Sequence, residues 1–305
     1  MSIVSAPLLK ISIVTPSYNQ ALFLNEAIES VLAQRDPNLE YVVVDGGSTD
    51  GSVDIIRRHA SRLTHWVSEP DGGHYDAINK GFAKTTGDVM AWLNSDDMYT
   101  PWSFSIVREI FSKYPEVEWL TTLQSLSWNR QGQPISIVFG GGFNRKLFLK
   151  GGNLPTKGSF GRRFIQQEST FWRRSLWDRA GGRLDTSFRL AADFELWARF
   201  FQHADLHGVL APFGGFRIHG NQKSVLQAAE YMEEAERVLE KYSGKPCRGA
   251  EALLRGIVWI VGRHFALAAV PRIVRTMGIR SGLTFPTKNV QWDGEEWKIV
   301  SGFVI

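Results

Sequence analysis

Short, continuously apolar runs alternate in the first part of the chain with longer stretches in which apolar side chains recur at helical spacing. Ile11–Val14, Tyr41–Val44 and Val89–Leu93 are runs of the first kind, which is typical of parallel strands buried on both faces. Residues 22–34 are of the second kind, because Leu, Ala, Ile and Val recur there three and four positions apart. This succession of strand, loop and helix predicts a doubly wound, mostly parallel α/β sheet with helices on both faces.

The same patterns predict further elements along the chain. Helices are predicted at 52–59, at 76–82, from 191 onward and at 228–242, and strands at 65–68, 119–122, 135–139, 166–174 and 213–219. Near the C-terminus, Asp293-Gly294 lies between alternating residues and is a hairpin signal. We therefore divide the chain into a domain of residues 1–225 and a C-terminal helical extension with a β-hairpin, residues 226–305.

Within the extension, residues 252–276 are strongly apolar but are interrupted by arginines and by Pro271. Arginines beside Trp259 and Phe265 suit a helix that lies on a membrane surface. A helix that packs on the sheet, or a contact between two copies of the chain, explains the same pattern. No stretch has the roughly 18 uninterrupted apolar residues of a membrane-spanning helix.

Each early strand ends in a loop that carries Asp, Asn or Gly. These loops are residues 15–19, 45–51, 69–73 and 94–97. Because the carboxyl ends of parallel strands share one edge of a sheet, the loops predict a polar cleft, and their glycines would let the backbone approach phosphates. The chain has neither a Gly-x-Gly-x-x-Gly nor a Gly-x-x-x-x-Gly-Lys-Ser/Thr motif, which argues against a dinucleotide-binding Rossmann enzyme and a P-loop NTPase.

Asp96 and Asp97 directly follow an apolar strand and are the central candidates for chemistry. At the carboxyl end of a strand, two carboxylates could hold Mg²⁺ or Mn²⁺ that bridges phosphate oxygens. Together with Ser95, they could instead cap a helix that Pro101 helps to start. Taken by themselves, these residues leave both interpretations open.

Composition and charge narrow the class of protein. The 305 residues are 43% hydrophobic and 22% charged, as in a globular protein. Cys247 is the single cysteine, which excludes an internal disulfide and a cysteine metal cluster and suits a reducing cytosol. The N-terminus lacks the features of a signal peptide. A net charge of +4 suits an anionic substrate or membrane surface, and we find no nucleic-acid-binding motif.

A glycine-rich, basic segment occupies the middle of the chain. Its basic residues are Arg145, Lys146, Lys150, Lys157, Arg162 and Arg163. We interpret it as a solvated loop, since ordinary loops are commoner than functional ones of this length. The alternative is a mobile lid over a substrate that bears phosphate.

The polar loops also match a known family when their order and spacing are taken together. The matching residues are Ile11–Asn19, Val43–Gly51, Asn79–Gly81, Gly87-Asp88 and Asn94–Asp97. In this order they resemble the inverting GT-A glycosyltransferases of family 2, over residues 10–220. The resemblance implies the GT-A fold, which is a Rossmann-like, mostly parallel sheet, and a glycosyltransferase of hexosyltransferase type.

The resemblance also implies roles for residues around the donor. The nucleotide sugar would be bound by Thr15, Pro16, Ser17, Tyr18, Asn19, Asp45, Gly46, Asp76, Asn79, Lys80, Asn94, Ser95 and Asp96. The family often has an arginine where this chain has Ile78, so a contact with the diphosphate would fall to Lys80 or to another basic residue.

Further roles concern the metal and the acceptor. Asp97 would bind Mn²⁺ or Mg²⁺ on the diphosphate, with Asp96 and His219 as further candidate ligands, although a lone histidine at a strand end is commonly a surface residue. Asp193 is similar to the second acid of a family pair that precedes Leu-Trp, and the first acid is Ala192 here. Asp193 would be the general base, where the simpler role is a helix-dipole partner. The acceptor or the donor sugar would contact Glu168 and Trp197.

The predicted chemistry needs few groups. A bound cation stabilises the leaving diphosphate as a Lewis acid, and a carboxylate within hydrogen-bond reach makes the acceptor hydroxyl nucleophilic. One displacement from the opposite face inverts the anomeric centre. We therefore predict a metal-dependent inverting glycosyltransferase that uses a nucleoside-diphosphate sugar, with UDP or dTDP ahead of GDP. It would act in polysaccharide or glycolipid assembly on a glycan or lipid-linked acceptor, in the cytoplasm and peripherally on the inner face of the plasma membrane.

Two other classes of protein stay open at this point. A nucleotidyltransferase also uses a metal and an α/β sheet, but residues 15–19 lack its usual glycine-rich loop with a basic residue. It would release pyrophosphate rather than a nucleoside diphosphate. A non-catalytic sugar-nucleotide binder or scaffold would bind without turnover, and the presence of both Asp97 and Asp193 argues against it.

Overall fold

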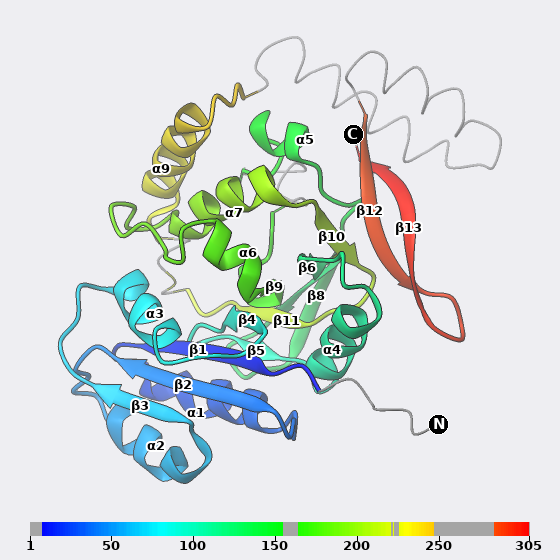
Figure 1. Cartoon of the computed structure of the whole chain (residues 1–305). Helices are drawn as coiled ribbons and strands as arrows, with labels where there is room; N and C mark the ends of the chain where they lie inside the picture. Colours follow the sequence, from blue (N-terminus) through cyan, green and yellow to red (C-terminus); the bar gives the residue numbers. More distant parts are fainter. Residues whose placement is uncertain (1–7, 155–163, 221, 223–225, 247–283, 305) are drawn as a thin grey trace.

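The computed structural model describes residues 8–154, 164–220, 222, 226–246 and 284–304. These residues form two β-sheets, of which the larger has nine strands in the order β13-β12-β10-β6-β9-β4-β1-β2-β3 (Figure 1). Its strands are β1 (Ile11–Ser17), β2 (Leu39–Asp45), β3 (His65–Ser68), β4 (Val89–Trp92), β6 (Trp119–Thr122), β9 (Phe171–Arg173), β10 (Leu206–Val209), β12 (Phe285–Trp292) and β13 (Trp297–Val304).

The first part of this sheet is built as the sequence predicts. β1 pairs in parallel with β2 and β4, and β2 pairs in parallel with β3. The helices α1 (Ala21–Leu32) and α2 (Ser52–His59) cover one face and α3 (His74–Phe82) covers the other (Figure 1). α3 lies so close to β1 that a Cβ atom at Gly81 would come within 2.4 Å of Val14 Cγ1. The predicted α/β sheet with helices on both faces is confirmed.

Strand β1 is longer than predicted, because it continues through Thr15 and Pro16 to Ser17. Its pairing with β4 ends at Val14, whereas its pairing with β2 continues to Ser17. Pro16 thus lies beyond the register shared with β4. A proline without an N–H is tolerated in a strand where it interrupts no second ladder.

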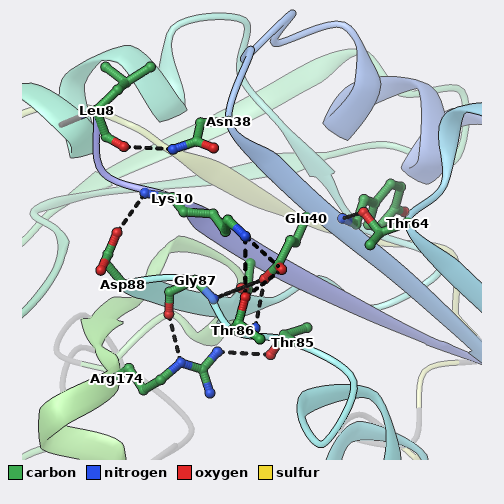
Figure 2. Close-up of polar contacts among 12 residues, drawn as sticks. Leu8, Lys10, Asn38, Glu40, Thr64, Thr85, Thr86, Gly87, Asp88 and Arg174 are labelled. Carbon is green, nitrogen blue, oxygen red and sulfur yellow. Dashed lines mark hydrogen bonds and ion pairs between the residues drawn. The ribbon is translucent and has the colours of Figure 1, made fainter.

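A polar network ties β1 and β2 to the turn before β4 (Figure 2). Glu40 accepts hydrogen bonds from Ser12 Oγ and from the N–H of Thr86, both at 2.7 Å. The N–H of Gly87 donates to the same carboxylate at 2.9 Å, and Lys10 Nζ lies 3.1 Å from it. Burial alone would raise the pKa of Glu40, but the bonds from Thr86, Ser12 and Lys10 lower it to about 2. The charged carboxylate therefore holds three segments of the chain together.

Replacing Glu40 by Gln should lower the free energy of unfolding by about 2 kcal/mol at pH 7, the usual size for hydrogen bonds to a charged group. Folding lowers the pKa of Glu40. Its contribution to stability is therefore complete above pH 4.5, the pKa of Glu40 in the unfolded chain, and is lost as the pH falls through about 2. The difference between the two proteins should therefore shrink at pH 3. Urea unfolding of both proteins at pH 7 and pH 3 measures this difference. Equal stability of the two proteins at pH 7 would show that the Glu40 network contributes nothing.

The smaller sheet has the order β5-β11-β7-β8 among the described residues. Its strands are β5 (Met98–Tyr99), β7 (Gln124–Trp128), β8 (Pro134–Phe139) and β11 (Gly214–Arg217). β11 is antiparallel to β5 and parallel to β7. Because β5 directly follows Asp97, this sheet brings the end of β11 to the acids that follow β4.

Some predicted elements need correction. Residues 166–174, predicted as one strand, form a 3-10 turn, η3 (Gln167–Ser169), and then the short strand β9, which is antiparallel to β4 and β6. β7 and β10 were not predicted. In β10, a Cβ atom at Gly208 would lie 2.4 Å from Leu123 Cδ2. The glycine required by this close approach interrupts the apolar pattern that identifies a strand.

The basic middle segment is partly helical. In the described part, α5 (Arg145–Leu149) is capped by Asn144, whose side chain accepts a hydrogen bond from the N–H of Lys146 at 2.8 Å. The side chains of Leu147 and Phe148 are fully buried. The interpretation of these residues as a solvated loop is therefore wrong. The other basic positions of this segment, outside the described residues, are Lys157, Arg162 and Arg163.

Helices α7 (Ala192–His203) and α9 (Ala228–Lys241) lie side by side (Figure 1). The predicted C-terminal hairpin is present, since β12 and β13 are antiparallel, and β12 extends the larger sheet by pairing in parallel with β10. Further helices are η1 (Ala60–Arg62), α4 (Ser103–Lys113) and α6 (Arg174–Arg179). In the described part of the chain, no helix combines the length and apolar character needed to cross a membrane. The apolar segment 252–276 lies outside that part.

Candidate active site

Asp96 and Asp97 lie in a tight turn directly after β4. The N–H of Asp97 donates to the carbonyl of Asn94 at 3.1 Å, and the side-chain amide of Asn94 donates to the Asp97 carboxylate at 3.2 Å. α4 begins only at Ser103, with Trp102 at its N-cap position. The interpretation of the two acids as a helix cap is therefore wrong, and both lie at the carboxyl end of a central strand.

Strand β11 completes the surroundings of this acid pair from far along the chain. The N–H of Arg217 donates to Asp97 Oδ1 at 2.9 Å, and its guanidinium donates to the carbonyl of Asp96 at 2.7 Å. The same guanidinium forms an ion pair with Glu26 at 2.6 Å. His219 Nε2 lies 3.1 Å from Asp96 Oδ2. The structure thus brings together Asp96, Asp97 and His219, the three metal ligands that the sequence suggested.

The electrostatics of this cluster favour a cation. Asp97 is 1% exposed, and burial raises its pKa well above the usual range, with the nearby charges of Asp96 and Glu168 raising it further. Within the described chain, no three or more His, Cys, Asp or Glu side chains are arranged to hold a metal by themselves. Mg²⁺ in phosphate sites commonly needs only one or two carboxylates, because phosphate and water oxygens supply the other ligands. The donor set therefore fits a cation held jointly with a diphosphate.

Glu168 is a buried carboxyl in η3 within electrostatic reach of the same acids. It accepts a hydrogen bond from the amide of Gln166 at 2.6 Å. Burial raises the pKa of Glu168 to about 7, and the charges of Asp96 and Asp193 act in the same direction. This carboxyl therefore keeps its proton to a higher pH than an exposed glutamate does.

Asp193 lies in the first turn of α7, as predicted, and is 8% exposed. The hydroxyl of Tyr231 is 3.2 and 3.4 Å from its two carboxylate oxygens and donates to them. Burial raises the pKa of Asp193 to about 6, although the N–H of Phe194 and the hydroxyl of Tyr231 act in the opposite direction. A buried carboxylate with a pKa near neutrality can accept a proton from a bound hydroxyl.

The loops after β1 and β2 are joined to each other. The buried carboxylate of Asp45 accepts hydrogen bonds from Ser48 Oγ at 2.6 Å and from Ser68 Oγ at 2.7 Å. The N–H of Asn19 donates to Ser48 Oγ at 2.8 Å, and its side-chain oxygen accepts from the N–H of Thr49 at 3.0 Å. Asp45 therefore shapes the loop on which nucleoside binding was predicted.

Of the predicted residues 15–19, only the two that follow the end of β1 reach the surface. Tyr18 is 63% exposed. Thr15 and Pro16 are buried, and the hydroxyl of Thr15 is hydrogen-bonded to a tyrosine of β2 at 3.0 Å. Ser17 is also buried, and its carbonyl accepts the N–H of Gly46 at 2.8 Å. A ligand can therefore meet Tyr18 and Asn19, which are exposed, whereas the three buried residues before them fix the strand beneath.

The predicted residues of α3 divide in the same way. Asp76 and Lys80 are half-buried and form an ion pair of 3.2 Å across one helical turn, and Lys80 Nζ lies 3.7 Å from Glu69. Asn79 exchanges two hydrogen bonds with the backbone of Leu184, at 2.8 and 3.0 Å. Asn79 therefore anchors the loop before α7, and its amide serves the protein's own backbone.

Trp197, a predicted sugar contact, lies in the aromatic core. It is 1% exposed and stacks on Trp92 and Trp119 at centroid distances of 6.0 and 5.6 Å. No face of its ring is open to a sugar. Trp197 is itself part of α7, so its ring instead anchors the helix that carries Asp193 on the aromatic core.

Two residues that hold the site acids were missed in the sequence. Arg217 precedes His219 by two positions on a predicted strand, so both side chains should face the same side. Both indeed contact Phe23, with the guanidinium of Arg217 5.0 Å and the ring of His219 4.6 Å from its centroid. Tyr231 carried no such signal, because it lies in a charged helix with no motif around it.

A cavity of about 640 Å³ lies beside the Asp45 loop, between α2 and β3. Its lining includes Ser48, Arg57, Trp66 and Ser68. None of the acids at the end of β4, in η3 or in α7 lines it. It is therefore separate from the acidic cluster.

A mostly parallel sheet with an acid pair at its carboxyl edge is the arrangement expected of a GT-A-type glycosyltransferase. A sequence model described as Glycosyl transferase family 2 matches residues 12–170, which is more than half of the chain. The chain belongs to glycosyl transferase family 2. The predicted family, fold and glycosyltransferase activity are confirmed.

Curated relatives agree with this assignment. An uncharacterised glycosyltransferase of Mycobacterium tuberculosis (strain CDC 1551 / Oshkosh) is 32% identical over 201 residues, which cover 64% of this chain and 69% of that protein. A protein of Mycobacterium bovis (strain BCG / Pasteur 1173P2) named PGL/p-HBAD biosynthesis glycosyltransferase is 27% identical over 215 residues, covering 67% of this chain and 77% of that protein.

Solved structures show the same fold. S. aureus TarS 1-349 in complex with UDP superposes with a TM-score of 0.56 at 16% identity, covering 89% of this chain and 74% of that chain. This chain covers 44% of the longer TarS chain. The mannosyltransferase PcManGT from Pyrobaculum calidifontis, in complex with GDP-Man and Mn2+, gives a TM-score of 0.54 at 17% identity, covering 90% of this chain and 81% of that chain.

Proposed function

We propose that this protein is a metal-dependent inverting glycosyltransferase that transfers a sugar from a nucleoside-diphosphate sugar to an acceptor hydroxyl, in polysaccharide or glycolipid assembly. One observation carries the proposal: the acid pair Asp96-Asp97 follows β4 at the carboxyl edge of the sheet, where His219 Nε2 lies 3.1 Å from Asp96, and Glu168 is within electrostatic reach of both this pair and the buried carboxyl of Asp193. We infer that a proton acceptor and an acid pair able to hold a cation belong to one site. This is the combination that a single inverting displacement needs.

In the proposed reaction, Asp193 accepts the proton of the acceptor hydroxyl while the oxygen of that hydroxyl attacks the anomeric carbon, and the bond from this carbon to the diphosphate oxygen breaks. Asp97 and Asp96, with His219, would hold the divalent cation, which when bound supplies Lewis-acid stabilisation of the leaving diphosphate. Arg217 holds Asp97 and Asp96 in place through its backbone N–H and guanidinium. Glu168 is within electrostatic reach of both Asp96 and Asp193, and its proposed role is a contact with the acceptor or the donor sugar.

The nucleoside is proposed to lie against the joined loops after β1 and β2, where Tyr18 is exposed. The solved structures of similar fold contain UDP in one case and GDP-Man in another, so either base class is compatible with this architecture. We propose UDP or dTDP ahead of GDP as the donor nucleotide, with Mn²⁺ or Mg²⁺ as the metal.

Thermal unfolding with UDP, dTDP and GDP, each with and without Mn²⁺, tests the site. Only a ligand that binds the folded state raises the melting temperature. We expect one nucleotide to raise it by several degrees in the presence of Mn²⁺ only, which also names the base of the donor. If none of the three stabilises the protein with or without metal, the proposed metal–nucleotide site is wrong.

We also propose that the protein is cytoplasmic, contacts the inner face of the plasma membrane and uses a lipid-linked acceptor. It rests on the apolar, arginine-containing sequence of residues 252–276 and on the net charge of +4. Co-sedimentation of the full chain with anionic vesicles should persist at raised salt. Protein that stays in the supernatant at low salt would exclude the membrane contact.

A further inference from the structure

The acid proposed as the general base is held by a helix that lies outside the family match. Asp193 is on α7 and its hydrogen-bond partner Tyr231 is on α9, whereas the family match ends at residue 170. The phenol oxygen of Tyr231 is nearly equidistant from the two carboxylate oxygens, at 3.2 and 3.4 Å. Both side chains are buried, so water does not compete freely for this bond.

The same helix also fixes the backbone that leads into α7. Glu234, one turn after Tyr231, accepts hydrogen bonds from three successive N–H groups, those of Arg189 at 3.0 Å, Leu190 at 2.9 Å and Ala191 at 2.9 Å. The N-cap position of α7 is Ala191, whose side chain cannot accept a hydrogen bond. The Glu234 carboxylate from α9 therefore fixes the backbone that leads into α7, up to its N-cap residue Ala191, two residues before Asp193.

The far end of α9 is tied to α7 separately. Lys241 Nζ lies 2.9 Å from Glu195 Oε1, and the hydroxyl of Tyr242 donates to the same oxygen at 2.6 Å. Glu195 also pairs with Arg199 at 2.8 Å. These bonds keep α9 alongside α7 (Figure 1), but they do not contact Asp193. They offer a control for any effect that comes merely from loosening the two helices.

Several titratable groups face Asp193 from the elements packed around it. Tyr231 and Glu234 approach from α9, Tyr75 from α3, and Glu168 from η3. The negative charge of Glu234 raises the pKa of Asp193, while the hydrogen bond from Tyr231 lowers it. The two α9 side chains thus act on the same carboxyl in opposite directions, which makes their effects separable.

We propose that α9 is part of the active site, with Tyr231 as the positioning residue that orients the carboxylate of Asp193 and Glu234 as the residue that fixes the start of α7. This inference rests on the proposed role of Asp193 as general base. Tyr231 would hold one carboxylate rotamer, so that an oxygen faces the acceptor hydroxyl, and would keep Asp193 ionised at neutral pH. The C-terminal extension would then be needed for catalysis and not only for binding.

The direct test is a pH titration of the Asp193 carboxyl by ¹³C NMR in full-length protein labelled at Asp, with Asp193→Asn identifying its signal. In Tyr231→Phe, which keeps the ring and removes the hydroxyl, the pKa of Asp193 should rise by about one unit, the effect of losing a hydrogen bond to the charged form. In Glu234→Gln it should fall, because a like charge is removed. Tyr242→Phe, the matched control, should leave it unchanged.

Activity then separates this inference from the proposed function. With the donor identified by thermal unfolding, the pH profile of kcat/KM can be measured. Its acid limb should shift to higher pH in Tyr231→Phe and should stay in place in Tyr242→Phe. An unmoved Asp193 titration in both Tyr231→Phe and Glu234→Gln would overturn the inference, even if Asp193→Asn is inactive. Normal turnover of Asp193→Asn would instead overturn the proposed function, and the inference with it.

Discussion

Replacing Asp193 by Asn should abolish sugar transfer while nucleotide binding is retained. Asn has the same shape and can still accept the hydrogen bond of Tyr231, but it cannot take a proton from the acceptor. Loss of a general base typically costs about 10²- to 10⁴-fold in rate. Release of nucleoside diphosphate in the presence of donor and acceptor measures it, with thermal stabilisation by the same nucleotide as the binding control.

The same variant should not lose stability at neutral pH. Folding raises the pKa of Asp193 from 3.8 to about 6, so the folded state binds the proton more tightly than the unfolded chain. The contribution of Asp193 to the stability of the fold is therefore favourable below pH 3.8 and is lost as the pH rises through about 6. At pH 7 the ionised group costs up to about 3 kcal/mol, which Asn removes. An inactive variant that is also clearly less stable at pH 7 would point to a structural role for Asp193 instead.

Replacing Asp97 by Asn should remove both the metal-dependent stabilisation by nucleotide and the transfer activity. A nucleotide at about 100 times its Kd stabilises a protein by about 2.7 kcal/mol, and this effect should disappear because the cation loses a charged ligand. Transfer should fall by at least about 10²-fold, since charge on the departing diphosphate is no longer offset. Melting curves with and without Mn²⁺, followed by the transfer assay, measure the two effects.

A matched control is available at the opposite edge of the sheet. Asp205 is exposed, precedes β10 and pairs with Lys288 at 3.0 Å. Asp205→Asn makes the same chemical change and should leave both nucleotide stabilisation and transfer unchanged. If Asp97→Asn behaves like Asp205→Asn, Asp97 has no part in binding the metal–nucleotide complex.

The two acids proposed for the active site could be predicted from the sequence for different reasons. Asp97 follows a continuous apolar run, and the topology of an open α/β sheet places the residue after such a strand at a ligand-binding edge. Asp193 was predicted only through the resemblance of residues 193–197 to a family motif. Neither inference could exclude competing roles, such as a helix cap for Asp97. That decision needed the start of α4 at Ser103.

Other predicted contacts show where local patterns mislead. Thr15, Asn79 and Trp197 all lie in or beside matching motifs. In the structure, however, their polar or aromatic groups bond or stack with other parts of the protein. A motif records that a residue type is needed at a position, but it does not tell whether the need comes from a ligand or from packing. Burial and hydrogen-bond partners make that distinction.

By itself, the sequence determined the alternation of strands and helices, the edge of the sheet at which polar loops gather and the family to which the chain belongs. These follow from local periodicity and from short motifs, which depend on residues close in the chain. Only the tertiary structure decided which distant groups complete the site: Arg217 beside Asp97, 120 residues away, and Tyr231 beside Asp193, 38 residues away. Such pairs form because the pairing of β11 with β5 and the packing of α9 on α7 bring them together, and no local pattern encodes those contacts.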